Sequence, residues 1–194
     1  TESAPLTTST TPSSPCRPSD RAINRIETQV GIVGAGPAGL MLSHLLAREG
    51  IDSAVIEAKS RQYVEERVRA GVLEQGTVDL MLETGVGERM RRQGLVHHGI
   101  ELRFGGRGHR IDLSALTGGR TITIYGQNEV VKDLTDARLA AGGRVLFECT
   151  DVGVHDFDGS NPVLRFRHGG IESEVKCDFI AGCDGFHGVC RETI

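Results

Sequence analysis

Residues Gln29–Glu57 read QVGIVGAGPAGLMLSHLLAREGIDSAVIE, and they contain a strand pattern, a glycine-rich turn, a helix pattern and a second strand pattern. Val30–Val33 is a short apolar run rich in β-branched residues, which predicts a buried strand. Leucines from Leu40 to Leu46 continue as a largely apolar helix. Ile51–Ile56 predicts another short strand, which ends at the acidic Glu57. This order predicts an α/β fold with a parallel sheet.

Three glycines between the first strand and the helix form the pattern G-x-G-x-x-G. Gly34 permits a tight turn, Gly36 removes a side chain where a pyrophosphate approaches the backbone, and Gly39 allows close packing of helix on strand. The helix start offers unpaired N–H groups and a positive dipole end. Glu57 follows 18 residues after Gly39, where a carboxylate can accept hydrogen bonds from both ribose hydroxyls. The whole unit predicts a dinucleotide site in preference to a bare structural turn.

The composition suits a soluble globular domain. The chain has 194 residues, of which 38% are hydrophobic and 25% charged, and its formal net charge is −4. This balance gives no reason to expect nucleic acid or an anionic membrane surface as a partner. Residues 28–47 lack charged side chains over about the length of a membrane span. Four glycines, Pro37, Ser43 and His44 interrupt that run, so we interpret it as the buried strand and helix of a cytoplasmic protein.

Five cysteines are present, an odd number, and no two form a C-x-x-C pair. The spacings of Cys177, Cys183 and Cys190 do not fit a zinc ribbon, and no fourth ligand is obvious. We therefore expect no metal site and interpret the cysteines as reduced thiols in a packed region.

Residues 1–27 differ in composition from the rest of the chain. Thr, Ser and Pro dominate as far as Ser19, and the segment has too little apolar surface to order itself. The sequence predicts a disordered tail over 1–27 and a domain over 28–194.

The segment 58–76 is rich in charge and ends in a glycine-containing turn. Arg67 and Arg69 are two residues apart, so in an extended loop they point the same way and could clamp a pyrophosphate or a carboxylate. A solvated charged loop is the alternative. Short helices are predicted over 72–82 and 87–93.

Between residues 95 and 182 the apolar pattern changes to a period of two. Strict alternation over 100–104, the turn 105–108 and a return strand over 111–113 predict a hairpin. A strand over 120–125 precedes an amphipathic helix over 127–141. Strands over 145–149, 152–157, 163–166 and 171–179 predict a β-meander inserted in a doubly wound sheet. A last strand over 179–181 leads to Asp184, which fits either a cofactor contact or a plain helix N-cap.

Together these motifs resemble the N-terminal half of the group A flavoprotein monooxygenases, from about Thr28 to Ile194. The resemblance rests on Glu57 and on these segments: GAGPAG (34–39), RVRAGVLEQGTVDL (67–80), GLVHHGIE (94–101), YGQNEV (125–130) and DFIAGCDGFHGVCR (178–191). It implies a Rossmann-like FAD/NAD(P)-binding domain with a parallel sheet, a β-meander insertion and an additional hairpin. Residues 97–125 would contribute to the substrate-side sheet.

The resemblance also implies residue roles. FAD would contact the following residues: Gly34, Gly36, Ala38, Gly39, Glu57, Arg67, Val68, Arg69, Ala70, Gly71, Val72, Gln127, Asp184 and Gly185. The nicotinamide nucleotide, NADPH or NADH, would contact Arg69, His187 and Arg191, and it would share the turn at Asp184. His97 matches the family's proton-relay histidine, although by spacing alone it is an ordinary surface histidine beside His98.

The activity implied is hydroxylation of a small aromatic acid with O2, in a protein that is a homodimer at full length. Three departures from the family pattern matter. Ala38 replaces a frequent serine, which removes a hydroxyl contact worth about 0.5–1.5 kcal/mol. Ala58 replaces a basic residue linked to NADPH, so the choice of nucleotide stays open. The aromatic-acid pocket and a later FAD motif would lie beyond Ile194, so the C-terminal part of the fold would be missing.

We therefore expect residues 1–194 alone not to hydroxylate, and to bind FAD weakly or aggregate. Two other readings of the sequence are weighed against the monooxygenase. An NAD-dependent dehydrogenase would use the same glycine loop but leaves RAGVLEQG (69–76) and the turn at Asp184 unexplained. A non-catalytic dinucleotide-binding module would be complete in itself.

Overall fold

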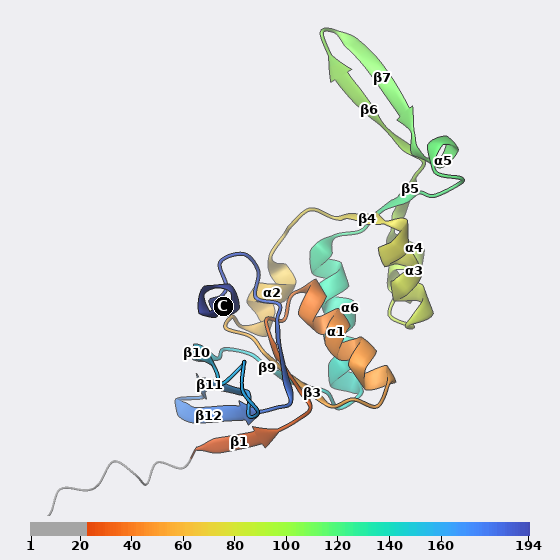
Figure 1. The fold of residues 1–194 in the computed structure, drawn as a ribbon. Coiled ribbons are helices and arrows are strands. Elements are labelled where there is room, and N and C mark those ends of the chain that lie inside the picture. The colour runs from red at the N-terminus through yellow and green to blue at the C-terminus, as the bar shows by residue number, and fades with distance from the viewer. Residues whose placement is uncertain (1–22) are drawn as a thin grey trace, which may run out of the picture.

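The computed structural model describes residues 23–194, which fold into three layers with a projecting arm (Figure 1). The central layer is a parallel sheet in the order β13-β2-β3-β9. Its strands are β2 (Val30–Val33), β3 (Ser53–Ile56), β9 (Arg144–Leu146) and β13 (Phe179–Gly182). The α/β class with a parallel sheet is therefore confirmed.

Helices α1 (Pro37–Arg48) and α6 (Gln127–Ala140) lie side by side on one face of this sheet. A second sheet, in the order β1-β12-β11-β10, covers the other face. Its strands are β1 (Asn24–Glu27), β10 (Thr150–His155), β11 (Val163–His168) and β12 (Ile171–Lys176). The short helix α7 (Val189–Thr193) packs near β10.

Alternation along β2 divides the core between the two faces of the parallel sheet. Val30 and Ile32 pack with the helices, whereas Val33 packs with the second sheet. Gly31 also faces the second sheet, and a Cβ there would lie 2.9 Å from Leu164. All four residues of β2 are buried. The strand is continuously apolar because it is covered on both sides, as in other parallel sheets.

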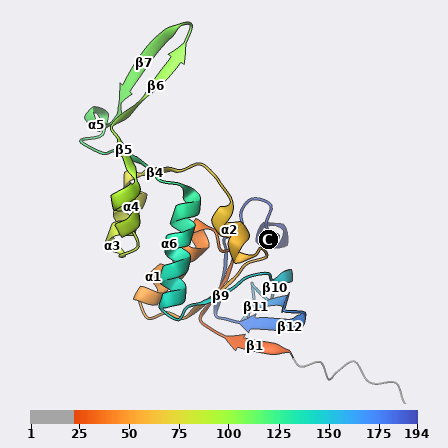
Figure 2. The same ribbon diagram turned by 180° about the vertical axis from the view of Figure 1, so that it is seen from behind.

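After α2 (Arg61–Glu66) the chain forms α3 (Gln75–Glu83) and α4 (Glu88–Gln93), whose Met81 and Met90 belong to the buried core beside α1 and α6. The helix α5 (Leu113–Leu116) lies in the projecting arm, at the base of the hairpin (Figure 1). A three-stranded sheet joins β4 (Val72–Glu74), β8 (Ile122–Ile124) and β5 (Leu95–His97). The hairpin of β6 (Gly99–Phe104) and β7 (Arg107–Asp112) extends away from the layers in both views (Figures 1 and 2).

The β-meander prediction was wrong at its first strand. The run predicted over 145–149 forms β9, which pairs in parallel with β3 in the central sheet instead of joining the meander. The run predicted over 171–179 is β12, which ends at Lys176, and the separately predicted last strand over 179–181 is confirmed as β13 of the central sheet. The apolar run over 145–149 is consistent with either sheet, because the pattern does not encode the pairing partner. The meander itself is β10-β11-β12, and it is antiparallel as expected.

Several boundaries also differ from the sequence predictions: the hairpin's return strand β7, for example, starts at Arg107 instead of residue 111. Residues 24–27, predicted to lie in the disordered tail, form β1 and pair in parallel with β12. The rest of that tail, residues 1–22, lies outside the described residues. The helix predicted over 72–82 begins instead with β4, because Val72–Glu74 pairs with β8 before α3 starts. Within residues 23–194, no helix combines the length and the apolar character needed to cross a membrane.

Candidate functional site

The glycine-rich loop between β2 and α1 has the close approaches that its sequence predicts. Gly34 has φ +104°, and a Cβ on it would lie 2.5 Å from the carbonyl oxygen of Cys183. A Cβ on Gly39 would collide with the carbonyl oxygen of Gly34. Around Gly36, by contrast, no heavy atom of the described chain lies within 4 Å of a Cβ position. Two glycines are therefore needed for packing, and the third leaves open space in front of the loop.

The first turn of α1 faces this space without a side-chain cap from the residues that the structure describes. Pro37 occupies its first position, no acidic residue lies in the first turn, and Ala38 is exposed. N–H groups in the first turn of a helix have no partner within the helix and carry a partial positive charge. The loop and helix start thus form a cradle suited to a pyrophosphate. The residues present fit the ADP half of FAD.

Glu57 lies directly beside this cradle. One oxygen of its carboxylate, Oε2, accepts a hydrogen bond from the N–H of Ala35 in the loop at 2.8 Å. The other, Oε1, accepts from the N–H of Lys59 at 2.8 Å. The Glu57 backbone is fixed by bonds to Leu146 and Cys149. Each carboxylate oxygen keeps a further acceptor site, so Glu57 can bind hydroxyl donors in the cradle.

The turn after β13 meets the glycine loop from the other side. The Cα of Asp184 would lie 2.9 Å from a Cβ on Gly34, so the two predicted nucleotide motifs converge. Asp184 accepts a hydrogen bond from the N–H of Cys190 at 3.0 Å through Oδ2, which satisfies the start of α7. The N-cap residue of α7 is Gly188, so Asp184 is not a plain N-cap, although its carboxylate accepts from the second residue of that helix. Gly185, with φ +81°, is exposed beside it.

Two of the three predicted nicotinamide-nucleotide residues, His187 and Arg191, lie at this turn and just after it and are exposed, whereas Arg69 belongs to segment 67–72. The Arg191 guanidinium lies 3.7 Å from the ring centroid of Phe186, and that ring meets His187 edge-on at 5.0 Å. A pocket of about 520 Å³ opens beside them, and Val154, Phe157, Ile180, Gly182, Asp184, Gly185, Cys190, Arg191 and Ile194 line it.

The segment 67–72 reaches the start of α6 through Gly71. Its carbonyl accepts a hydrogen bond from the N–H of Tyr125 at 2.8 Å. A Cβ on Gly71 would lie 2.8 Å from the Cα of Gly126, so the two backbones are nearly in contact. This places the segment next to Gln127, the first residue of α6. The structure thus brings together two parts of the predicted FAD contact set that are far apart in the sequence.

The arginines of this segment point outward. The Arg67 guanidinium lies 5.7 Å from the ring centroid of Tyr63, and Arg69 and Ala70 are exposed. Val68 is 83% exposed. These side chains are solvated, and no partner within residues 23–194 holds Arg67 and Arg69 together as a clamp.

His97 is the last residue of β5, where it pairs with Ile122 of β8 and is exposed. Its neighbour His98 contacts the hydroxyl of Ser114 through Nδ1 at 3.0 Å. Figure 1 shows β5 at the base of the projecting arm, apart from α7 and the turn before it. The structure therefore does not bring His97 to the glycine loop.

Sequence reasoning missed a charged network beneath the start of α6. The phenol of Tyr125 donates to Oδ2 of Asp133 at 2.7 Å, and Arg89 of α4 bonds to both Asp133 and Glu129. Burial and the bond to Asp133 raise the pKa of Tyr125. Bonds from Lys132 and Arg89 lower the pKa of Glu129. The i, i+4 spacing of Glu129 and Asp133 was visible in the sequence, but their partner on α4 was not.

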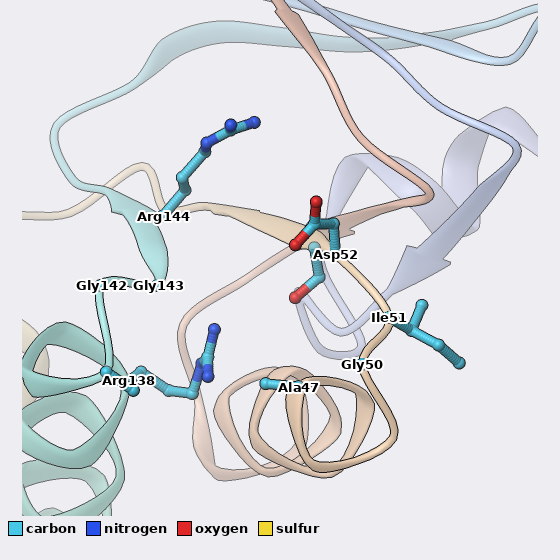
Figure 3. A pocket seen from close by; sticks show the side chains of 10 residues that line it. Ala47, Gly50, Ile51, Asp52, Arg138, Gly142, Gly143 and Arg144 are labelled. Carbon is cyan, nitrogen blue, oxygen red and sulfur yellow. The ribbon is translucent and has the colours of Figure 1, made fainter.

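A second pocket, of about 340 Å³, lies at the opposite end of the parallel sheet (Figure 3). It is lined by Asp52, Ser53 and Arg144 at the starts of β3 and β9, together with the C-terminal ends of α1 and α6. Nucleotides bind such sheets at the carboxyl ends of the strands. The buried Arg138 reaches into this pocket and donates to the hydroxyl of Ser43 at 3.0 Å. Its guanidinium complements the negative ends of the two helices.

The four cysteines of residues 23–194 are free thiols. Cys149, Cys177 and Cys190 are buried, and Cys183 is partly buried. Burial raises the pKa of Cys149 to about 11 and that of Cys190 to about 12. The prediction of unpaired thiols in a packed region is confirmed for these four, while Cys16 lies outside the described residues.

Fold and loop together define a flavin-nucleotide-binding protein, and the chain belongs to the FAD binding domain family, whose model matches residues 27–194. The chain is 48% identical over 169 residues to p-hydroxybenzoate hydroxylase of Acinetobacter baylyi, a match that covers 87% of this chain and 42% of the relative. It is 29% identical over 169 residues to Monooxygenase 1 of Arabidopsis thaliana, covering 86% of this chain and 40% of that protein.

Solved structures agree with this assignment. The p-nitrophenol 4-monooxygenase PnpA from Pseudomonas putida superposes with a TM-score of 0.73 at 19% identity, over 87% of this chain and 43% of that one. The OxyS anhydrotetracycline hydroxylase from Streptomyces rimosus gives 0.71 at 25% identity, over 86% and 33%. The chain spans about two fifths of the length of the curated relatives it matches. These matches confirm the resemblance to the flavoprotein monooxygenases and the prediction of FAD as cofactor.

Proposed function

We propose that this chain is the FAD-binding part of a hydroxylase that converts 4-hydroxybenzoate to 3,4-dihydroxybenzoate with O2 and NADPH or NADH. The supporting observation is the 48% identity to p-hydroxybenzoate hydroxylase, against 29% to Monooxygenase 1. Such a difference along the same length of chain favours the activity of the former relative. We propose the cytoplasm as its location.

The chain's own residues would bind and orient the cofactor. The loop of Gly34, Gly36 and Gly39, with the N–H groups at Ala38, would bind the pyrophosphate, and Glu57 would accept from the adenosine ribose. Segment 67–72 and Gln127 would line the flavin. Asp184 and Gly185 would complete the binding site opposite the loop. Bound FAD supplies electron transfer from the nicotinamide nucleotide to O2 and oxygen transfer to the ring, while the protein positions the reactants and excludes water.

The nicotinamide nucleotide would bind near the exposed turn at Gly185. Arg191 and Arg69 would offer guanidinium groups to its phosphates. His187 would be a third contact. No basic residue follows Glu57 directly, since position 58 is alanine. We therefore leave NADPH and NADH as equal candidates for the reductant.

His97 would carry the proton of the substrate phenol to solvent. Loss of that proton makes the ring electron-rich, which favours attack on an electrophilic oxygen. The exposure of His97 at the edge of β5 suits exchange with water. The side chains that hold the aromatic acid would come from sequence that the relatives have in addition to this part, and the complete enzyme would be a homodimer.

A second candidate is a flavin monooxygenase for another phenol or aromatic acid. The structural neighbours support it, because they include a p-nitrophenol monooxygenase and an anhydrotetracycline hydroxylase with the same fold. A non-catalytic module that only binds the dinucleotide is the third. The substrate that is hydroxylated distinguishes the two monooxygenases from each other. Any catalytic turnover distinguishes both of them from the non-catalytic module.

The first experiment is a visible absorption spectrum of the purified chain, before and after addition of FAD. A flavin spectrum that stays with the protein through gel filtration supports the proposal, and a colourless chain that binds NADH would favour a dehydrogenase. In a polypeptide extended to the length of the relatives, 4-hydroxybenzoate should stimulate NAD(P)H oxidation and yield 3,4-dihydroxybenzoate. Residues 1–194 alone should give no product. Stimulation by another phenol only would shift the assignment to the second candidate.

A further inference from the structure

Tyr125 joins two segments that are both proposed to contact FAD. It follows β8 at the point where the chain turns into α6, and it is 5% exposed. Its N–H donates to the carbonyl of Gly71 at 2.8 Å, which attaches segment 67–72. Its phenol donates to Asp133 on the second turn of α6 at 2.7 Å, which fixes the corner to the helix.

Arg89 completes this corner from α4. Its Nε donates to Oδ1 of Asp133 at 2.6 Å, so the two oxygens of one carboxylate are held by two different partners. The guanidinium also bonds to the side chain and the carbonyl oxygen of Glu129 and lies 5.6 Å from the ring centroid of Tyr125. Lys132 holds Glu129 at 2.8 Å. The network is partly buried, with the Asp133 side chain 12% exposed.

This network lies where segment 67–72 meets the start of α6. Exposed salt bridges contribute little to stability, but partly buried and interconnected groups restrict one another's geometry. Glu129 and Asp133 lie on the first two turns of α6, directly after Gln127. The carbonyl that receives the Tyr125 N–H belongs to Gly71, whose backbone is nearly in contact with Gly126. Movement of the corner therefore moves both the segment and Gln127.

We propose that Tyr125, Asp133 and Arg89 are positioning residues that hold segment 67–72 and Gln127 in the arrangement that receives FAD. The inference rests on the proposed FAD contacts of that segment. Without the phenol-to-carboxylate bond, the corner between β8 and α6 loosens and the segment leaves its place. The parallel sheet and the glycine loop do not depend on this bond, because they pack through apolar contacts and backbone pairing.

Trypsin tests the position of the segment directly, because Arg67 and Arg69 lie within it and Arg103 lies in the distant hairpin. The variants are Tyr125→Phe, which removes only the hydroxyl, and Asp133→Asn, which removes the charge. We expect cleavage after Arg67 and Arg69 to become about tenfold faster in both, the factor that about 1.4 kcal/mol produces. Cleavage after Arg103 should not change. The FAD dissociation constant should rise by a similar factor in a flavin-fluorescence titration.

Glu174→Gln is the matched control, because it removes a carboxylate that pairs with Arg25 at 2.9 Å in the second sheet. It should leave the cleavage ratio and FAD affinity at the wild-type values. Arg89→Lys keeps the charge but cannot reach two carboxylates with a planar fork, so it should give an intermediate increase.

Two results would overturn the inference. One is wild-type cleavage after Arg67 and Arg69, with wild-type FAD affinity, in both Tyr125→Phe and Asp133→Asn. The other is equal acceleration after Arg67, Arg69 and Arg103, because that shows a loss of global stability and no positioning role. Absence of FAD binding in a wild-type polypeptide of the relatives' full length would contradict the proposed cofactor contacts. The cleavage ratio would still decide whether the network positions the segment.

Discussion

The loop between β2 and α1 and the β6–β7 hairpin both follow from short residue patterns, but their surroundings differ. Gly34 of the loop packs against the turn at Cys183 and Asp184, Gly39 packs against Gly34, and all four residues of β2 are buried. The hairpin extends away from the layers (Figure 2). Its strictly alternating apolar residues Ile100, Leu102 and Phe104 are 40%, 46% and 71% exposed.

This difference shows that an alternating pattern specifies the apolar face of a strand but not the surface that covers it. Alternation predicts that one face of a strand is apolar, and it implies a surface that covers this face. In the core, the chain itself provides that surface, from α1 and α6 on one side and the second sheet on the other. In the hairpin, no part of residues 23–194 provides it. A two-stranded hairpin is at best marginally stable without such packing.

The largest expected effect tests the close packing in the core. Gly39→Ala places a Cβ against the carbonyl oxygen of Gly34, and relief requires the backbone of the loop to move. We expect a loss of about 3 kcal/mol of unfolding free energy, measured by urea unfolding. Gly76→Ala in α3 is the matched control. The space around Gly76 is open, so the change should be neutral or stabilising by up to about 1 kcal/mol. Equal urea midpoints for the two variants would show that the close approach is not required.

The second prediction concerns the cofactor side of the core. Glu57→Gln keeps the shape of the side chain but removes the charge that accepts from the loop at Ala35. We expect the FAD dissociation constant to rise by about 10- to 100-fold, the range for hydrogen bonds to a charged group. A flavin-fluorescence titration measures it, with Glu66→Gln on the exposed end of α2 as control. An unchanged FAD dissociation constant in Glu57→Gln would show that Glu57 does not contact the cofactor.

The third prediction is a pH dependence that arises in the core. Burial raises the pKa of the Cys149 thiol to about 11, from 9.0 in the unfolded chain. The folded state therefore keeps this proton where the unfolded state releases it, and the stabilisation is complete below pH 9 and decreases as the pH rises toward 11. We expect a loss on the order of 2 kcal/mol. Urea unfolding between pH 8 and 11 should show a shallower decrease in Cys149→Ala. If the unfolding free energies of the wild type and Cys149→Ala decreased in parallel with pH, Cys149 would not be the source of this pH dependence.

The smallest expected effect lies in the hairpin. Phe104→Ala removes a large apolar side chain that is 71% exposed, so the unfolding free energy should change by less than about 0.5 kcal/mol. FAD affinity should not change either, because the hairpin lies far from the glycine loop in both views (Figures 1 and 2). A loss of unfolding free energy above about 1 kcal/mol in this chain would mean that the apolar face of the hairpin is covered in solution. The contrast between the covered core and the exposed hairpin would then be wrong.

Local motifs were the part of this protein that could be predicted. The pattern of Gly34, Gly36 and Gly39 located the nucleotide cradle, because its constraints act between residues a few positions apart. The start of α6 at Gln127 and the existence of the hairpin follow from the same short-range rules. Pairing partners could not be predicted in the same way. The strand β9 was predicted to belong to the meander, although it pairs with β3.

Contacts between residues far apart in the sequence could not be predicted. The sequence did not show that Asp184 accepts a hydrogen bond from the N–H of Cys190, and its contact with the cofactor stays a prediction. The network of Arg89, Asp133 and Tyr125 was absent from the sequence predictions, because α4 and α6 are 44 residues apart at that contact. Helical spacing identifies which carboxylates share a face of the helix, but not which arginine from another helix pairs with them.

The sequence by itself determined the βαβ unit, the glycine loop and the acid at its end, since steric limits on backbone angles and close approach act locally. Tertiary structure alone decided that the segment at Gly71 lies against the start of α6, that the turn at Asp184 meets Gly34, and that the hairpin face stays exposed. These outcomes depend on which surfaces the whole chain brings together. Burial and electrostatic pairing are sums over distant residues, and no short pattern contains them.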